Sequence, residues 1–442
     1  MLRNICIGVS AALLVCLLAA CGGSNSSNSS TANNTASPSG SQPGAGGSSG
    51  GSSGSGSVSG SGSTGNGGSG GSSGGDSNSG SNQYVYIANS GSATVAGYKT
   101  NSDGTLASVP GSPYLIPGQA PFDEEPESLA VMGNFLYAAT ANPNSSNGIT
   151  GFKINSADGS LTMFNPSKGD SGHYFFLVAD SQRGFLYAAG SASLGTGMIS
   201  AFKENSDGSL ALIGGQTGTM GSLELDPQGR FLFDFVQNKI HVFPRSPDGS
   251  LGAEVSGSPF AAGTVYAYSG PDDPNPCFFD ALNRVMAVDQ AGRFLYSTCD
   301  ANAEIDEFSI SNAGQLTLIG TIPATPQGEL SSLAISHDGS TLFGTQEELN
   351  QVVSFSIDRS SGKLSPAATI SAGTRPNSAA LDGSNHFLYV TNGSSNHSHN
   401  NSKNGSDNMS EYGVTPAGMM TALSGSPITT GQNPRSVVAA SF

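Results

Sequence analysis

The chain has 442 residues, of which 16 are lysine or arginine and 32 are aspartate or glutamate, giving a net charge of −16 at neutral pH. A surface this acidic argues against nucleic acid and against anionic lipid headgroups as partners. The chain holds no tryptophan, which is unusual for a carbohydrate-binding face built on large aromatic side chains.

Residues 1–21 are typical of an export signal. Arg3 precedes an apolar stretch from Ile5 to Leu18, and small residues then lead to Cys21. Leu-Ala-Ala-Cys resembles the bacterial lipobox, in which the cysteine is acylated and becomes the new N-terminus. A plain signal peptide and an uncleaved anchor helix are the alternatives, and the apolar run is short for a bilayer span. Gly22 follows the cysteine, so we expect an exported protein that is lipid-anchored to the outer membrane or cell surface.

Residues 22–82 are almost entirely glycine, serine, asparagine and threonine. Such a segment buries too little apolar surface to offset the entropy of ordering. A Gly/Ser coil of this length spans ~45 Å root-mean-square. We predict a disordered tether between the lipid anchor and a folded domain at 83–442.

A repeat dominates residues 83–442. Seven short apolar runs end in an aromatic residue, and a turn glycine follows each aromatic after six or seven residues. The aromatics are Tyr98, Phe152, Phe202, Phe243, Phe308, Phe355 and Tyr412, and the glycines are Gly104, Gly159, Gly208, Gly249, Gly314, Gly362 and Gly418. Short strands with Asp-Gly-type turns, repeated every 40 to 65 residues, are typical of β-propeller blades.

Each repeat contains four strands, which we name A to D in chain order. Strand A is a small-aliphatic run and strand B usually begins Phe-Leu-Tyr, as at 135–137 and 294–296. The folded domain starts with a B strand at Tyr84, and a seventh A strand appears only at its end, from Ser436 to Ala440. The sequence therefore predicts an all-β, seven-bladed propeller of four antiparallel strands per blade. Its C-terminal strand pairs into the first blade and closes the ring.

The connections differ in length between the two faces of such a ring. The A–B and C–D turns share one face and are short. The long connections, 113–126, 260–284 and 392–407, belong to the D–A and B–C loops and leave from the other face. We call the second face the long-loop face and expect binding to occur there.

Two cysteines remain in the folded domain, Cys277 before strand A of blade five and Cys299 at the end of its strand B. The start of A and the end of B meet at the same rim, so a disulfide in an oxidising compartment and two free thiols both remain open.

Acidic and histidine-containing segments are candidate metal sites. Asp123, Glu124, Glu125, Glu127, Asp272, Asp273, Asp300, Glu347 and Glu348 fall on loops of one face. They could form an oxygen-rich site for a divalent cation such as calcium, or a solvated acidic rim. His397 and His399 form a second candidate, without a third ligand nearby in the sequence.

Motifs that form the blades carry a family resemblance. The segments Tyr84–Gly91 and 225–233, and the Gly-Ser-Pro triplets at 111–113, 257–259 and 425–427, resemble the lactonase family of seven-bladed propellers. That family includes 6-phosphogluconolactonase-like proteins, and the resemblance covers essentially all of 83–442. The resemblance specifies the fold strongly and the activity weakly.

The resemblance implies histidine, arginine and glutamate side chains around the mouth of the central channel. The residues that match are His173, at the start of a strand A, and Arg435, with Glu127 as an acid/base partner; Arg375 offers similar chemistry. Lactone hydrolysis needs a general base for water and a cation or donor for the oxyanion.

Two functions stay open at this stage. We expect a monomeric, lipid-anchored module that binds a small molecule, or a surface protein or glycan, through the long-loop face. The alternative is a lactone hydrolase, 6-phosphogluconolactonase-like, with its site at the channel mouth. In either case the membrane is contacted through the lipid only.

Overall fold

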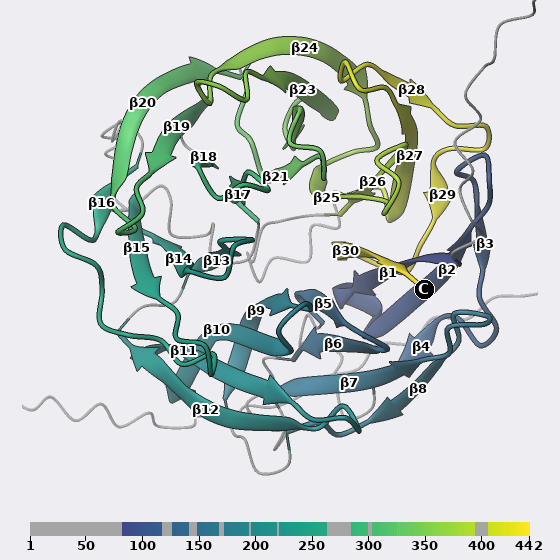
Figure 1. Cartoon of the computed structure of the whole chain (residues 1–442). Helices are drawn as coiled ribbons and strands as arrows, with labels where there is room; N and C mark the ends of the chain where they lie inside the picture. The colour runs from purple at the N-terminus through teal and green to yellow at the C-terminus, as the bar shows by residue number, and fades with distance from the viewer. Residues whose placement is uncertain are drawn as a thin grey trace, which may run out of the picture. The chain divides into compact units, whose positions relative to one another are not determined.

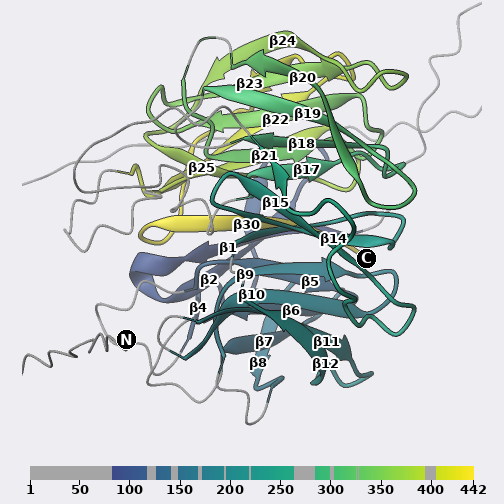
Figure 2. The same cartoon turned by 90° about the vertical axis from the view of Figure 1, so that its left-hand side faces the viewer.

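The computed structural model describes residues 82–116, 126–140, 148–167, 172–193, 196–218, 221–262, 284–298, 303–324, 326, 328–393 and 405–442. These residues form seven antiparallel sheets arranged around a central axis (Figure 1), and the same ring is seen from the side in Figure 2. Within the described ranges the only helix is a single 3-10 turn, Ser90–Ser92. The prediction of an all-β propeller with seven blades of four strands is confirmed.

The strands nearest the axis are the A strands, which we call the inner strands. From blade 1 to blade 7 they are β30 (Pro434–Ser441), β5 (Leu129–Met132), β9 (His173–Asp180), β13 (Ser222–Leu225), β17 (Met286–Val288), β21 (Ser332–Ile335) and β25 (Pro376–Leu381). The B strands that follow are β1 (Gln83–Asn89), β6 (Phe135–Ala139), β10 (Phe185–Ser193), β14 (Phe231–Val236), β18 (Phe294–Thr298), β22 (Thr341–Gln346) and β26 (Phe387–Asn392).

The C and D strands complete each blade towards the outside of the ring. The C strands are β2 (Thr94–Thr100), β7 (Ile149–Ile154), β11 (Thr196–Glu204), β15 (Lys239–Pro244), β19 (Glu304–Ile310), β23 (Gln351–Ile357) and β27 (Asn408–Val414). The D strands are β3 (Leu106–Ser108) with β4 (Tyr114–Leu115), β8 (Leu161–Phe164), β12 (Leu210–Thr217), β16 (Phe260–Ala261), β20 (Leu316–Pro323), β24 (Leu364–Ser371), and β28 (Met420–Ala422) with β29 (Ile428–Thr429).

Blade 1 is assembled from both ends of the folded domain. Its B strand, β1, pairs antiparallel with β30 from Gln83 opposite Ser441 to Asn89 opposite Pro434. The backbone N–H of Phe442 also donates to the carbonyl of Asn82, at 2.9 Å. The predicted closure by the C-terminal strand is confirmed, so the propeller has no open blade edge at the point where the chain begins.

The hydrophobic core is divided among the blade junctions. Seven clusters of buried apolar side chains occur in the described part of the chain, and each joins residues of two adjacent blades. The seventh cluster packs Val85 and Tyr98 of blade 1 against Tyr389 and Met409 of blade 7. Burial between blades, rather than within one blade, therefore stabilises the ring.

A tyrosine of one blade bonds to the turn glycine of the next blade at five junctions. The tyrosine is the last residue of the Phe-Leu-Tyr pattern in strand B, or of Tyr84-Val85-Tyr86 in blade 1, and its hydroxyl donates to the glycine carbonyl. The pairs are Tyr86 with Gly159 (2.9 Å), Tyr137 with Gly208 (2.8 Å), Tyr187 with Gly249 (2.8 Å), Tyr296 with Gly362 (3.0 Å) and Tyr389 with Gly104 (3.0 Å). The repeated tyrosine and the repeated glycine are thus two halves of one contact.

The same junctions explain why the turn residue is glycine. A Cβ atom on Gly104 would lie 2.2 Å from the ring of Phe387, the first residue of the Phe-Leu-Tyr pattern of blade 7. Gly104 also has a φ of +83°, a left-handed conformation that disfavours other residues. In blade 6, where Phe343 replaces the tyrosine, Ser354 Oγ donates to the carbonyl of Gly418 at 2.7 Å instead.

Serine side chains link the inner strands around the axis. Ser436 Oγ accepts a hydrogen bond from the backbone N–H of Leu129 in blade 2, at 3.2 Å, and Ser378 Oγ accepts one from Val437 in blade 1, at 3.4 Å. Ser128 and Ser222 form the same contact with blades 3 and 5. The serine that marks strand A in the sequence therefore sets the spacing of neighbouring blades.

The Gly-Ser-Pro triplets lie just before the last paired segment of the outer strand, which corrects the predicted start of two long connections. In blade 1 the triplet separates β3 from β4, and Ser112 Oγ accepts a hydrogen bond from Gly97 N at 2.9 Å. Because β4 and β16 pair with strand C, the long connections predicted from 113 and 260 begin after residues 115 and 261.

A buried glutamate lies at the junction that closes the ring. Glu411 of β27 is 1% exposed, and burial raises the pKa of its carboxyl to about 7. Glu307 occupies the same position in blade 5, where Lys363 of the next blade lies 3.0 Å away. Blade 1 has Thr105 at the place of Lys363, so Glu411 meets no lysine from its neighbour among the described residues.

We expect Tyr389→Phe to lower the free energy of unfolding by about 1–2 kcal/mol, because the carbonyl of Gly104 loses its buried donor. Tyr114→Phe is the matched control, since the hydroxyl of Tyr114 bonds to the carbonyl of Pro110 at the exposed surface. Chemical denaturation of both variants measures the difference. Equal losses in the two variants would contradict a special role for the interblade contact.

The pKa of Glu411 predicts a pH-dependent stability. A carboxyl whose pKa is raised in the folded state contributes most below its ordinary value of about 4.5 and loses that contribution as the pH rises through about 7. We expect the free energy of unfolding of Glu411→Gln, relative to that of the wild type, to increase by on the order of 2 kcal/mol between pH 5 and pH 8. Glu307→Gln, which breaks the pair with Lys363, is expected to be destabilised at pH 8. A pH-independent difference for Glu411→Gln would refute the raised pKa.

Candidate functional site

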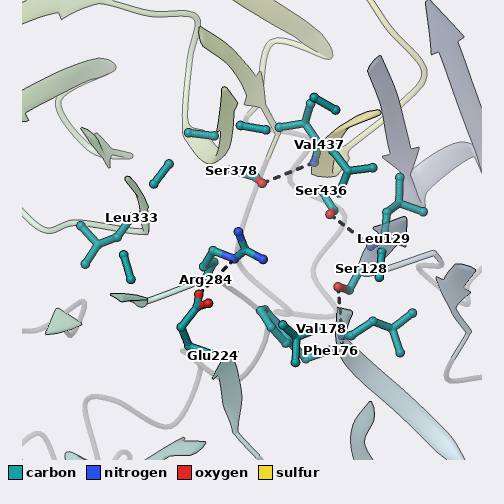
Figure 3. Close-up of a pocket in the computed structure, with 18 of the residues that line it drawn as sticks. Ser128, Leu129, Phe176, Val178, Glu224, Arg284, Leu333, Ser378, Ser436 and Val437 are labelled. Atoms are coloured by element: carbon teal, nitrogen blue, oxygen red, sulfur yellow. Dashed lines mark hydrogen bonds and ion pairs between the residues drawn. The ribbon is translucent and has the colours of Figure 1, made fainter. Parts of the chain in front are cut away.

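A cavity of about 290 Å³ lies on the axis, where the inner strands meet. Most of its wall is formed by aliphatic side chains and backbone of the inner strands, as the close-up in Figure 3 shows. Leu129, Val178 and Val437 are examples from three blades. Charged side chains are few in this wall, so each one determines what the cavity can bind.

Two carboxylate–guanidinium pairs contribute those charges. Glu224 Oε2 lies 3.6 Å from Arg284 Nε, and Glu127 Oε2 lies 3.7 Å from Arg435 Nε. Each pair joins two adjacent blades, because Glu224 and Arg284 come from blades 4 and 5, and Glu127 and Arg435 from blades 2 and 1. The cavity therefore combines two acids and two cations with aliphatic side chains, serine and asparagine side chains and backbone.

Glu224 and Arg284 are the pair that faces the open part of the cavity. Figure 3 shows the guanidinium of Arg284 pointing towards the middle of the ring, with Glu224 beside it. The side chain of Arg284 is 45% exposed, whereas that of Glu224 is 15% exposed. Burial raises the pKa of the Glu224 carboxyl, and Arg284 and the N–H of Leu225 partly oppose this rise. A carboxylate of raised pKa beside a solvent-accessible guanidinium is a combination common in active sites.

The local sequence explains how these two side chains reach the cavity. Glu224 is the third residue of β13, two positions after Ser222, which contacts blade 5. Arg284 occupies the serine position of blade 5, since its carbonyl accepts a hydrogen bond from the N–H of Leu333 in the next blade, at 2.7 Å. At this position most of the other inner strands have a serine, whereas blade 5 has the longer, positively charged Arg284.

Glu127 and Arg435, which the sequence analysis selected, are brought together, but they are closed to solvent. Glu127 is 5% exposed and Arg435 is 4% exposed. Asn377 lies beside them and donates from Nδ2 to the carbonyl of Pro434 at 3.0 Å. A buried ion pair of this kind braces the starts of the inner strands, and its removal leaves a costly uncompensated charge.

His173 is placed differently. It begins β9, and it is not among the described residues that line the cavity. The register of β9 against β10 shifts between Ala189 and Gly190, which pair with Phe176 and Tyr174. Phe176 therefore occupies the serine position of blade 3, and His173 lies three residues before it. Glu127 and Arg435, in contrast, directly precede the serines of their strands. No described contact joins His173 to Arg435 or Glu127.

Arg375, also considered from the sequence, pairs with Glu347 on the long-loop face. Its guanidinium donates to Glu347, and its backbone N–H donates to Asn350 Oδ1 at 2.8 Å. Glu347 is buried, so it contributes to an ion pair between blades 6 and 7. It is not a solvated member of an acidic rim.

Several predicted features lie outside the described residues. They are Cys21, Asp123, Glu124, Glu125, Asp272, Asp273, Cys277, Cys299, Asp300, His397 and His399. Over the described ranges, no group of three His, Cys, Asp or Glu side chains is placed to hold a metal ion. None of the helices described here is long and apolar enough to cross a membrane.

Sequence reasoning missed Glu224 and Arg284. Glu224 is a single acid between two leucines in an inner strand, where the other blades have alanine, valine or methionine at the equivalent position. That departure from a small-aliphatic pattern is the signal that could have identified it. Arg284 follows a segment without a recognisable motif, so only the register of β17 reveals its position.

Comparison with protein families supports the architecture. The family model described as lactonase, seven-bladed β-propeller, matches residues 135–264 and 283–406, more than half of the chain. A search of the curated proteins found no match.

Similar solved structures have the same ring of blades. A structure described as a putative 6-phosphogluconolactonase from Bacteroides fragilis has 16% sequence identity and a TM-score of 0.62, covering 82% of this chain and 99% of that one. A similarly described protein from Bacteroides uniformis has 17% identity and a TM-score of 0.63, covering 81% and 99%. The periplasmic gluconolactonase PpgL of Pseudomonas aeruginosa has 19% identity and a TM-score of 0.58, also covering 81% and 99%. At these identities the likeness shows the fold alone.

Proposed function

Because the chain belongs to the lactonase family of seven-bladed β-propellers, we propose that it hydrolyses a small lactone in the central cavity. Glu224 and Arg284 act in the chemical step. The observation that carries this proposal is the pairing, inside the axial cavity, of a carboxylate of raised pKa with a partly exposed guanidinium. These are the two groups that ester hydrolysis requires.

Glu224 is the general base. Its carboxylate removes a proton from a water molecule as the water oxygen attacks the carbonyl carbon of the lactone. A pKa raised by burial makes the carboxylate a stronger base at neutral pH than an exposed glutamate.

Arg284 stabilises the oxyanion that forms on the lactone carbonyl. The guanidinium presents several N–H donors and is charged at any physiological pH. Collapse of the intermediate breaks the ring C–O bond, and the ring oxygen takes back the proton from Glu224. The product is a hydroxy acid, and the carboxyl formed from the lactone is released as a carboxylate.

A binding module without catalysis is the second candidate. The observation that favours it is that the cavity lies at the inner strands, whose starts are at the long-loop face, where a ligand or partner would approach. In that case the charged pairs of the cavity orient a ligand that carries hydroxyl or carboxylate groups, and they take part in no chemical step.

We expect the mature protein to open a lactone from a panel of five- and six-membered sugar-acid lactones. Glu224→Gln and Arg284→Met should each lower kcat/KM by about 100-fold or more, because one removes the base and the other the oxyanion partner. Hydrolysis is followed by the acid that is released.

Matched controls separate the proposed site from other acids and from the site predicted from the sequence. Glu254→Gln removes a glutamate that pairs with His241 away from the cavity, at 3.1 Å, and should retain full activity. His173→Ala should also retain activity if Glu224 is the base, and lose about 100-fold if His173 takes part in the chemical step. If a ligand raises the melting temperature but no lactone is hydrolysed, the protein is a binding module and not a hydrolase.

The lipid anchor is a second part of the proposal. Cys21 follows Leu-Ala-Ala after an apolar segment, and the sequence resembles a lipobox. The acylated cysteine would hold the propeller at the outer membrane or cell surface through the Gly/Ser-rich segment that follows.

Cys21→Ser should abolish incorporation of labelled fatty acid and release the protein from membranes. Cys16→Ser is the matched control, because Cys16 lies within the apolar part of the signal segment and should leave labelling unchanged. Membrane fractionation together with fatty-acid labelling measures both effects. Equal membrane association of the Cys21→Ser variant and the wild type would refute the anchor.

A further inference from the structure

A second cavity, of about 270 Å³, lies between blades 5 and 6 at the face of the A–B and C–D turns. Its wall includes Asp289, Arg293 and Phe294 of blade 5, and Asp338, Ile357 and Arg359 of blade 6. None of these residues takes part in the cavity on the axis. The site is therefore separate from the proposed hydrolase site.

Asp289 is one of four aspartates at equivalent positions in blades 3, 4, 5 and 7. Asp180, Asp226, Asp289 and Asp382 each stand five residues before the phenylalanine that begins strand B. All four are largely buried: the side chains of the first three are 6%, 0% and 7% exposed, and Asp382 is 1% exposed. The internal repeat thus offers three reference sites for the surroundings of Asp289.

At all three reference sites the Oδ2 atom has a close donor, which is an arginine at two of them. Asp226 Oδ2 accepts a hydrogen bond from Arg230 Nε at 2.6 Å. Asp180 Oδ2 lies 2.7 Å from Arg245 Nη2. Asp382 Oδ2 accepts a hydrogen bond from the hydroxyl of Ser384.

Asp289 differs from the other three at this atom. Its Oδ2 has only Arg293 Nε, at 3.6 Å, while its Oδ1 accepts the backbone N–H groups of Arg293 and Phe294. Among the four Oδ2 atoms, that of Asp289 alone has no donor within hydrogen-bonding distance among the described residues, and Asp289 lines a cavity.

The occupant of the reference site at blades 3 and 4 shows what fits such a space. Arg245 comes from strand C of blade 4, and its guanidinium is 2% exposed. It bonds to Asp180 of blade 3 and, through Nε, to the hydroxyl of Tyr187 at 2.9 Å. The residue at the same place in blade 6, two positions after the strand C aromatic, is Ile357. An isoleucine cannot reach Asp289 with a donor.

We propose that the cavity between blades 5 and 6 binds a guanidinium group supplied by a ligand, with Asp289 as its acceptor. The ligand would take the place that the side chain of Arg245 fills between blades 3 and 4. A guanidinium can donate an N–H group to Asp289 Oδ2, and its flat face suits the apolar side of the cavity at Ile357.

The charges around the cavity are compatible with a cation. Asp338 and Arg359 lie at the rim, 3.9 Å apart and both exposed, so the pair adds little net potential. Arg293, whose side chain is 51% exposed, stacks on the ring of Phe294 at 5.2 Å and donates from Nη2 to the carbonyl of Arg359 at 2.8 Å, so it is held to one side of the cavity. Asp180 already holds two arginines, Arg183 and Arg245, in the same molecule, so a second guanidinium beside such an aspartate is an arrangement that this fold accommodates.

Titration of the mature protein with ethylguanidinium chloride tests the proposal by calorimetry, with ethylammonium chloride and sodium chloride as controls. We expect saturable binding in the millimolar range for ethylguanidinium and no saturation for sodium chloride. Free L-arginine and an end-blocked Gly-Arg-Gly peptide distinguish the sources of the group. Equal binding of both indicates an arginine side chain of a protein partner, and binding of the free amino acid alone indicates a small-molecule ligand.

Three variants assign the binding to this cavity. Asp289→Asn should weaken ethylguanidinium binding at least tenfold. Ile357→Arg should fill the site from within, raise the melting temperature and abolish the binding, whereas Ile357→Met, which adds no charge, should retain it. Absence of saturable binding in the wild type, or unchanged binding in Ile357→Arg, would overturn the proposal.

Discussion

The constraint on which the ring depends is the contact of a turn glycine with the aromatic ring of the preceding blade. Any Cβ atom on Gly104 would overlap Phe387, and the carbonyl of the same glycine receives a buried hydroxyl from Tyr389. One residue thus sets both the distance and the register between two blades. Because the contact recurs around the ring, the angle between blades is repeated until the last blade meets the first.

The position of the axial cavity follows from that regularity. Serines of the inner strands bond to the next blade, and the strands are held close enough to leave only a small space at the axis. Side chains at particular positions of these strands then project into a cavity whose walls are held by the contacts between blades. Replacing a serine by Arg284, or an alanine by Glu224, changes the chemistry of the cavity without changing the scaffold.

The fold could be predicted from the sequence because the same contacts recur in successive blades, so the weak sequence pattern of each blade is supported by the others. The candidate site could not, because each of its groups occurs once. Glu224 and Arg284 are single departures from a strand pattern. His173 lies three residues before Phe176, which takes the serine position in blade 3, and because Phe176 is not a serine, only its pairing partners reveal that position. The long connections were predicted to begin at 113 and 260 for a similar reason, since the outer strands pair again after the Gly-Ser-Pro triplets.

The split first blade also decides when the propeller can be completed. The strand β1 leaves the ribosome early, yet its inner partner is β30, the last strand of the chain. Blades 2 to 7 can form in order as the chain emerges, while the first blade waits with one edge unpaired. A protein of this construction finishes folding only after its final residues have arrived. In an exported chain, as proposed above, β1 would cross the membrane before β30, so the ring would close only on the far side.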